Sequence, residues 1–321
     1  MGASYYFYKY YWIDCVLYSW EKTIMTILLQ VAGLTKQFAE KVVVDGIEFS
    51  LEKNTSTALI GPNGAGKTTT LSMLTGLLKP TSGSVKMLDG HLRANIGFLP
   101  QYPQFYPWLS ALEFTEMAAK LNGVPAKKAQ AEAKKTLEFV GLGDDLNKKI
   151  STFSGGMKQR LGISQAIVHK PKLLLLDEPV SALDPVGRRE VLDLLKGLQQ
   201  ETTILYSTHI LNDAEEMTDQ LLFLRDGKLV EQGTLREVRQ RFEESNYVVE
   251  FSTEKEAQLF ASQSELIGKA KGSYVYIEII DEQPSMQGLL QHLSSCPYEI
   301  RKVERQTASL EEIFMKVARK I

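Results

Sequence analysis

Residues 153–160 read Phe153-Ser154-Gly155-Gly156-Met157-Lys158-Gln159-Arg160, and residues 173–179 read Leu173-Leu174-Leu175-Leu176-Asp177-Glu178-Pro179. In the first stretch Ser154 can cap the start of a helix, which leaves free amides pointing outward at the positive end of that helix. Such a helix end binds anions. The second stretch is a continuous apolar run, typical of a strand buried on both faces in a parallel sheet, and it ends in two adjacent acids. The two stretches therefore predict an α/β fold that handles phosphate groups.

A complete phosphate-binding loop lies upstream. Residues 61–68 fit the spacing G-x-x-x-x-G-K-[ST], and they follow an apolar run and precede a helix-like stretch, which is the context that supports such a match. Glycines let backbone N–H groups approach the phosphates closely, and the following helix directs its positive end at them. We expect Lys67 to reach the β- and γ-phosphates and Thr68 to bind Mg²⁺. The expected nucleotide-binding residues of this loop are Gly61, Pro62, Asn63, Gly64, Ala65, Gly66, Lys67, Thr68 and Thr69.

The order of these motifs resembles that of ATP-binding cassette (ABC) ATPases. The segment around Ser154 resembles their signature, although Phe153 and Met157 depart from its commonest Leu-Ser-Gly-Gly-Gln form. Those two side chains flank the backbone amides that would bind the phosphate, so we expect the segment to keep its nucleotide-binding function. Residues 181–184, Ser-Ala-Leu-Asp, resemble the D-loop of the family. The resemblance implies an α/β P-loop NTPase fold with an ABC-type core, an antiparallel β subdomain and a helical insert.

The resemblance also gives each matching residue a role. Asp177 would hold Mg²⁺ through water, and Glu178 would be the general base that orients and polarises the attacking water. Gln101 matches the Q-loop glutamine, which touches Mg²⁺ and relays the nucleotide state to the transport partner. His209, in Ser-Thr-His at 207–209, matches the switch histidine that contacts the γ-phosphate. Phe38 matches an aromatic residue that stacks on adenine, and a core aromatic is the alternative.

In the family the active site is shared between two chains. The signature closes over the ATP held by a second nucleotide-binding subunit, so the resemblance implies a head-to-tail dimer with two ATP molecules at its interface. The second subunit is either a second copy of this chain or a homologous chain. The residues expected to bind nucleotide at this interface are Ser154, Gly155, Gly156 and Asp184.

Three regions follow one another along the chain. Residues 1–24 form an aromatic-rich extension, and Met25 is a plausible alternative start; an interfacial aromatic anchor is the other reading of the extension. We expect an ABC ATPase domain over residues 25–240, with a helical insert at about 102–165, and a small α+β module over residues 241–321. The β-α-β order of that module would suit a ferredoxin-like arrangement. Residues 307–314 resemble the tail of the ATPases of ABC-2-type exporters.

Composition restricts the partners. The 321 residues carry a formal net charge of −2, which leaves no global basic field, so we expect no nucleic acid partner. The two cysteines, Cys15 and Cys296, match no C-x-x-C spacing. The sequence contains no run of about 18 apolar residues, so any membrane role requires a separate transmembrane permease.

We therefore expect an ATP-binding and ATP-hydrolysing subunit of a membrane ABC transporter, at the cytoplasmic face of the cell membrane. It would power the separate permease by ATP-driven dimer closure. The resemblance of residues 307–314 to the tail of ABC-2-type ATPases implies an exporter. The aromatic run at residues 102–109, directly after Gln101, is the candidate docking surface for the permease, and local packing is the alternative. The rival class is a soluble ABC ATPase of translation or DNA repair, which usually has two cassettes or long coiled-coil insertions.

Overall fold

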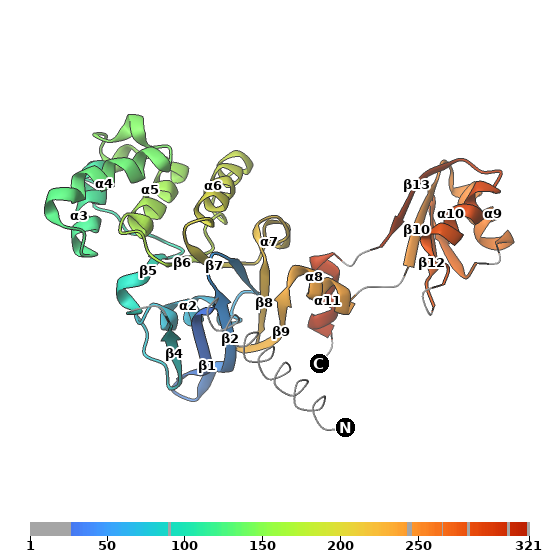
Figure 1. The fold of residues 1–321 in the computed structure, drawn as a ribbon, viewed down its shortest axis with the longest axis horizontal. Coiled ribbons are helices and arrows are strands. Elements are labelled where there is room, and N and C mark those ends of the chain that lie inside the picture. The colour runs from blue at the N-terminus through green and yellow to red at the C-terminus, as the bar shows by residue number, and fades with distance from the viewer. Residues whose placement is uncertain are drawn as a thin grey trace, which may run out of the picture. The chain divides into compact units, whose positions relative to one another are not determined.

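The computed structural model describes residues 27–88, 91–242, 246–264, 266–280, 283–306 and 309–319. The expected extension at residues 1–24 lies outside this described part. The chain divides into two compact units, Met1–Leu235 and Arg236–Ile321, and each is treated separately below. Figure 1 labels the elements of both units.

A mainly parallel sheet forms the centre of the first unit. Its six described strands lie in the order β5-β6-β7-β3-β8-β9. The strands β3, β6 and β7 are buried along their whole length, as strands covered on both faces should be, and β6 is the continuous apolar run that the sequence predicts. Parallel pairing brings the carboxyl ends of these three strands to one edge of the sheet. The strand bounds are β3 Ser56–Ile60, β5 Ile96–Leu99, β6 Leu173–Asp177, β7 Thr203–Thr208, β8 Gln220–Arg225 and β9 Lys228–Thr234, the last antiparallel to β8.

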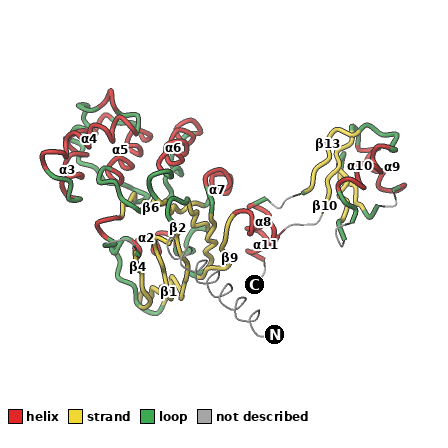
Figure 2. The backbone as a smooth tube through the Cα atoms, viewed as in Figure 1, coloured by secondary structure: helices red, strands yellow, loops and turns green. Residues whose placement is uncertain are grey.

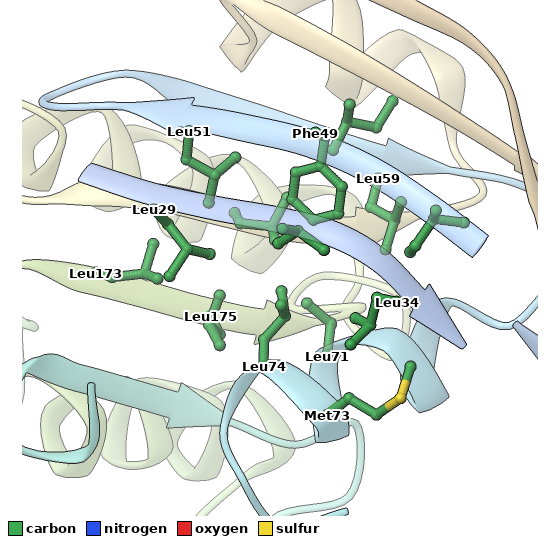
Figure 3. Close-up of a cluster of buried hydrophobic side chains, with 14 of the residues drawn as sticks. Leu29, Leu34, Phe49, Leu51, Leu59, Leu71, Met73, Leu74, Leu173 and Leu175 are labelled. Atoms are coloured by element: carbon green, nitrogen blue, oxygen red, sulfur yellow. The ribbon is translucent and has the colours of Figure 1, made fainter. Parts of the chain in front are cut away.

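An antiparallel sheet packs on this core. Its order is β2-β1-β4, with β1 Ile27–Phe38, β2 Lys41–Glu52 and β4 Ser82–Met87. The sequence predicts the β1–β2 hairpin but not β4, whose residues are mostly exposed and carry little apolar alternation. Leu29, Leu51, Leu71 and Leu173 are fully buried and come from β1, β2, α2 and β6, and they lie together in one cluster (Figure 3). This cluster ties the antiparallel sheet to the helix that follows the phosphate-binding loop.

That helix, α2, covers Lys67–Leu74. The sequence predicts a longer helix, to residue 78, and this prediction is wrong at its C-terminal end. Gly76 takes a φ of +74° just after the last turn, a left-handed conformation that ends helices.

Three helices make up the insert: α3 Ala111–Leu121, α4 Ala126–Phe139 and α5 Gly155–Ile167. They form one helical group in Figure 2, with the short 3₁₀ turns Gly143–Asp145 and Ile150–Thr152 between α4 and α5. The sequence Ser110-Ala111-Leu112-Glu113 predicts a capping box at the start of α3. This prediction is confirmed, because Ser110 and Glu113 bond to each other's backbone N–H. Two further helices follow β6 and β7, namely α6 Pro185–Leu198 and α7 Leu211–Met217.

The second unit contains a four-stranded antiparallel sheet in the order β11-β12-β10-β13. The chain order β10-α9-β11-β12-α10-β13 with this strand order is the predicted ferredoxin-like arrangement. Helices α9 and α10 pack on one face, through Phe260 and Leu289 among others. The bounds are α8 Leu235–Phe242, β10 Asn246–Phe251, α9 Glu254–Gln263, β11 Gly268–Lys271, β12 Tyr274–Glu278, α10 Met286–Ser294, β13 Ile300–Arg305 and α11 Leu310–Arg319. The sequence did not predict β11, a short strand with mostly exposed residues.

Candidate functional site

The phosphate-binding loop connects β3 to α2 and depends on close backbone approaches. A Cβ atom on Gly61 would lie 2.3 Å from the carbonyl oxygen of Leu224, so no larger residue fits there. Gly66 is the N-cap of α2, with a φ of +105°, and a Cβ atom on it would lie 2.8 Å from the carbonyl oxygen of Val43. Glycine is therefore required at both positions for conformation or for space, as the motif predicts.

Lys67 begins α2 and folds back over the loop. Its Nζ donates hydrogen bonds to Gly61 O at 2.7 Å and to Pro62 O at 3.2 Å. The same Nζ lies 3.7 Å from Glu178 Oε1. Burial lowers the pKa of the Lys67 ammonium, and the neighbouring carboxylates of Glu178 and Asp177 oppose that shift in part. The loop thus presents a buried cation beside Asp177, the last residue of β6, and Glu178, the residue that follows it.

Glu178 is the point on which the candidate catalytic residues converge. Gln101 Nε2 donates to Glu178 Oε2 at 3.1 Å, and His209 Nδ1 lies 3.2 Å from Glu178 Oε1. Gln101 and His209 directly follow β5 and β7, Lys67 begins the helix after β3, and the three side chains meet just after the end of β6. Residues far apart in the sequence are therefore brought together at the carboxyl edge of the sheet, where ligands bind in such folds.

A residue that the sequence reasoning missed joins the two acids. Asp177 is buried, and Ser207 Oγ donates to its Oδ1 at 2.6 Å. The same Oγ accepts a hydrogen bond from Glu178 N at 2.9 Å. The parallel register that pairs Asp177 with Ser207 explains this contact, and the position two residues before His209 was the signal that could have revealed it.

The expected metal-binding residues supply oxygen donors. Asp177 has a carboxylate, the exposed Thr68 has a hydroxyl, and Gln101 keeps its amide oxygen because its Nε2 is the atom that donates to Glu178. Mg²⁺ binds through one or two carboxylates, waters and substrate phosphates rather than through a cage of protein ligands. The chemistry of this donor set therefore fits Mg²⁺ bound with a nucleotide. Among the described residues, no group of three or more His, Cys, Asp or Glu side chains is arranged to hold a metal ion.

The signature segment starts α5 as the sequence predicts. Ser154 is the N-cap, and its side chain accepts a hydrogen bond from Met157 N at 3.3 Å. A Cβ atom on Gly155 or Gly156 would meet no atom within 4 Å, so the start of this helix faces open space within the chain. The closure of this segment over the nucleotide of a second chain stays a prediction.

The same helix is tied to the catalytic segment. Gln159 Nε2 donates to Pro179 O at 2.6 Å, directly after Glu178. Arg160 Nη1 also lies 3.6 Å from Glu190 Oε2, on α6. The sequence reasoning assigned no role to Gln159 or Arg160, because their partners lie beyond the signature motif itself.

Two other expected nucleotide contacts are accessible. Phe38, at the end of β1, is 47% exposed, and Lys36 Nζ lies 4.9 Å from the centre of its ring. This exposure argues against the core-aromatic alternative, and adenine stacking stays a prediction. Asp184 is the N-cap of α6 but makes no capping hydrogen bond with its side chain.

The aromatic run after Gln101 divides into packed and exposed members. The ring of Phe105 packs edge-on against Phe114 of α3, with 5.3 Å between the ring centres. Tyr102, Tyr106 and Trp108 are 73%, 48% and 65% exposed. Local packing therefore occurs in this segment, Tyr106 also packs on Phe114, and the role of the exposed rings as a docking surface stays a prediction. None of the described helices has the length and apolar character needed to cross a bilayer.

Comparison with known proteins gives matches to both units. The profile of the family described as "ABC transporter" matches residues 44–181, and that of "ATP-binding protein DrrA1-3-like, C-terminal domain" matches residues 233–318. The chain is 41% identical over 297 residues to the uncharacterized ABC transporter ATP-binding protein YxlF of Bacillus subtilis, covering 90% of this chain and 99% of that relative. It is 39% identical over 227 residues to the bacitracin transport ATP-binding protein BcrA of Enterococcus faecalis, covering 68% of this chain and 73% of BcrA.

Solved structures of ABC ATP-binding subunits are also similar to about two thirds of the chain. The chain is similar to an ATP-binding subunit of an ABC transporter, with a TM-score of 0.61 and 30% identity over 67% of this chain and 93% of that one. It is also similar to a dimeric post-hydrolysis ATP-binding cassette bound to ADP and Pi, with a TM-score of 0.59 and 26% identity over 65% of this chain and 99% of that one.

Proposed function

The chain belongs to the family of ABC transporter ATP-binding proteins, and from that membership we propose that it is the ATPase subunit of an exporter whose permease is a separate chain. The observation that carries the proposal is the convergence of Lys67, Gln101 and His209 on Glu178. Relatives described as bacitracin transport and linearmycin resistance ATP-binding proteins support export rather than import. The transport role is favoured over the translation or DNA-repair alternative, because similarity to ABC transporter ATP-binding proteins extends over 90% of the chain.

ATP hydrolysis would use the residues of this edge as follows. The glycine loop would cradle the phosphates, and Lys67 would exchange its bonds to Gly61 O and Pro62 O for phosphate oxygens. Asp177, Thr68 and Gln101 would hold Mg²⁺, which would supply positive charge to neutralise the charge that develops on the phosphates. Each of these groups acts by position and charge, as phosphoryl transfer requires.

Glu178 would take the role of general base. Its carboxylate lies at the carboxyl end of β6, 3.2 Å from His209 Nδ1. Once Lys67 moves to the phosphates, that carboxylate is free to accept a hydrogen bond from the attacking water. His209 would then contact the γ-phosphate from the end of β7.

A second nucleotide-binding subunit would complete the site. The capped and open start of α5 at Ser154 would close over the γ-phosphate held by the partner, with Phe38 stacking on adenine on the P-loop side. Asp184 would contribute from the D-loop. Binding of two ATP molecules would close the dimer, and hydrolysis would open it.

The permease would hold the subunit peripherally at the cytoplasmic face of the cell membrane. The exposed Tyr102, Tyr106 and Trp108 would form the docking surface, directly after the glutamine that touches Glu178. Aromatic side chains are enriched at protein interfaces for their large contact area. Residues 25–240 would form the motor domain and residues 241–321 the accessory module.

The test is purification of the tagged protein from native membranes in mild detergent, followed by mass spectrometry of stoichiometric companions. A polytopic membrane protein is the expected result, and its recovery should fall with a Tyr102→Ala, Trp108→Ala double variant. Tyr274→Ala is the matched control, because Tyr274 is also an exposed tyrosine but lies on β12. Ribosomal or DNA-repair companions for a soluble protein would overturn the transport role.

A further inference from the structure

One buried hydroxyl group joins the two acids at the end of β6. Ser207, the penultimate residue of β7, is fully buried, and the parallel register places it beside Asp177. Its Oγ donates to Asp177 Oδ1 at 2.6 Å and accepts from Glu178 N at 2.9 Å. A hydroxyl has a single proton to donate. The proton of Ser207 therefore goes to Asp177, and the oxygen holds the next residue by its backbone.

The bond to Glu178 N supports an unusual backbone. Glu178 has a φ of +49°, a left-handed conformation that residues other than glycine seldom adopt. Such conformations persist where the surrounding structure over-determines them. The turn at Glu178 directs its carboxylate toward Gln101 and His209, so the hydroxyl that holds this backbone also sets the direction of the proposed base.

The bond to Asp177 orients the proposed metal-binding carboxylate. The 2.6 Å distance is that of a short hydrogen bond from a hydroxyl to a charged oxygen. Because Ser207 holds Oδ1, the orientation of the whole carboxylate is fixed, and with it the direction of Oδ2. Outer partners that orient a ligating carboxylate change metal affinity or activity by about 10- to 100-fold when removed.

Other hydroxyls in the same sheet show that burial alone does not explain these two bonds. Ser56 Oγ and Thr57 Oγ1, at the start of β3, are buried and have no hydrogen-bond partner. We propose that Ser207 is a positioning residue for ATP hydrolysis, which fixes the carboxylate of Asp177 and the backbone of Glu178 at the same time. The inference rests on the proposed roles of those two acids.

The experiment compares Ser207→Ala with Ser207→Thr, which keeps the hydroxyl on a β-branched side chain suited to a strand. Ser207→Ala should lower kcat about 10- to 100-fold, with KM for ATP changed by less than about twofold. The dissociation constant of Mn²⁺, titrated with ADP present and followed by electron paramagnetic resonance, should rise about tenfold. Ser207→Thr should restore both quantities to within about threefold of wild type, and the control Ser56→Ala, which removes an unpartnered hydroxyl, should match wild type.

Unchanged kcat and unchanged Mn²⁺ affinity in Ser207→Ala would overturn the inference. If that variant loses its thermal unfolding transition, Ser207→Cys takes its place, because a thiol fills the site but hydrogen-bonds weakly; wild-type values in that variant would overturn the inference equally. Glu178→Gln, measured in parallel, separates two kinds of failure. If Glu178→Gln hydrolyses ATP normally, the proposed roles of the acids fail; if it is inactive while Ser207→Ala is normal, the role of Ser207 alone fails.

Discussion

Gln101 Nε2 donates a hydrogen bond to Glu178 Oε2 at 3.1 Å, across 77 positions of sequence. The glutamine therefore touches the proposed base itself. Glu178 Oε1 is shared at the same time by His209 Nδ1 and Lys67 Nζ, at 3.2 and 3.7 Å. Because Lys67 is expected to move to the phosphates when ATP binds, nucleotide binding must redistribute these contacts. The segment after Gln101, which carries the proposed docking surface, would respond to that redistribution.

Glu178→Gln should bind ATP and fail to turn it over. The amide is nearly isosteric with the carboxylate but cannot take a proton from water, so hydrolysis should fall by about 10²- to 10⁴-fold. The variant should accumulate as an ATP-dependent dimer, measured by size-exclusion chromatography with and without ATP. Rapid hydrolysis by this variant would show that the base lies elsewhere.

Lys67→Ala should weaken nucleotide binding. The variant removes a buried cation that the loop holds beside the expected phosphate site, 2.7 Å from Gly61 O. We expect the dissociation constant of a fluorescent ATP analogue to rise at least about tenfold, the loss of one charge-assisted hydrogen bond. Lys127→Ala, on the exposed side of α4, is a control for nonspecific loss of positive charge. An unchanged dissociation constant in Lys67→Ala would contradict the assignment.

The same lysine should make the nucleotide-free fold depend on pH. Burial lowers the pKa of Lys67 from its ordinary value of 10.5, and Glu178 and Asp177 offset this only in part. At pH values between the folded and the unfolded pKa of Lys67, the unfolded chain binds more protons than the folded chain. The loss of folding stability caused by the buried ammonium is therefore complete below the folded pKa, and it decreases as pH rises above that value. Nucleotide-free Lys67→Met should therefore melt at a higher temperature than wild type at pH 7, with the gap narrowing toward pH 10.

Calorimetric scans with and without ATP check this. With saturating ATP the order should reverse, because wild type binds ATP more tightly and so gains more binding free energy than the variant. A nucleotide-free Lys67→Met that melts at or below the wild-type temperature at pH 7 would contradict the prediction.

The sequence was sufficient to predict the elements whose signals are local. The buried apolar run of β6, the capping box at Ser110 and the glycine spacing before Lys67 each depend on neighbouring residues, and each corresponds to a described element. The strands β4 and β11 were not predicted because their side chains are mostly exposed, so no apolar alternation marks them. They exist through pairing with β1 and β12, which only the folded chain brings beside them.

The roles of Ser207 and Gln159 could not be predicted for a related reason. The sequence around His209 does not indicate a role for Ser207. The contact with Asp177 arises only from the register of β6 and β7 in the folded chain. Gln159 follows Met157, the last residue of the signature, by two positions, and its partner is a backbone carbonyl, which carries no side-chain signal. Side chains that act directly on phosphates can be predicted from motif spacing. Side chains that position those catalytic residues depend on tertiary contacts, which the sequence alone does not reveal.

Gln159→Ala should separate ATP binding from hydrolysis. The bond from Gln159 Nε2 to Pro179 O, at 2.6 Å, connects the start of α5 to the residue after Glu178. Its loss should make the position of Glu178 relative to the signature segment less well defined. We expect affinity for ATP within about twofold of wild type and a loss of kcat of about tenfold, because small misplacements of catalytic groups reduce rates strongly. Lys158→Ala is the matched control, since it changes the adjacent side chain on the same helix and leaves the bond in place. Equal kcat in the two variants would show that the bond is structural only, while a selective loss in Gln159→Ala would place α5 in the pathway between the signature and the catalytic acid.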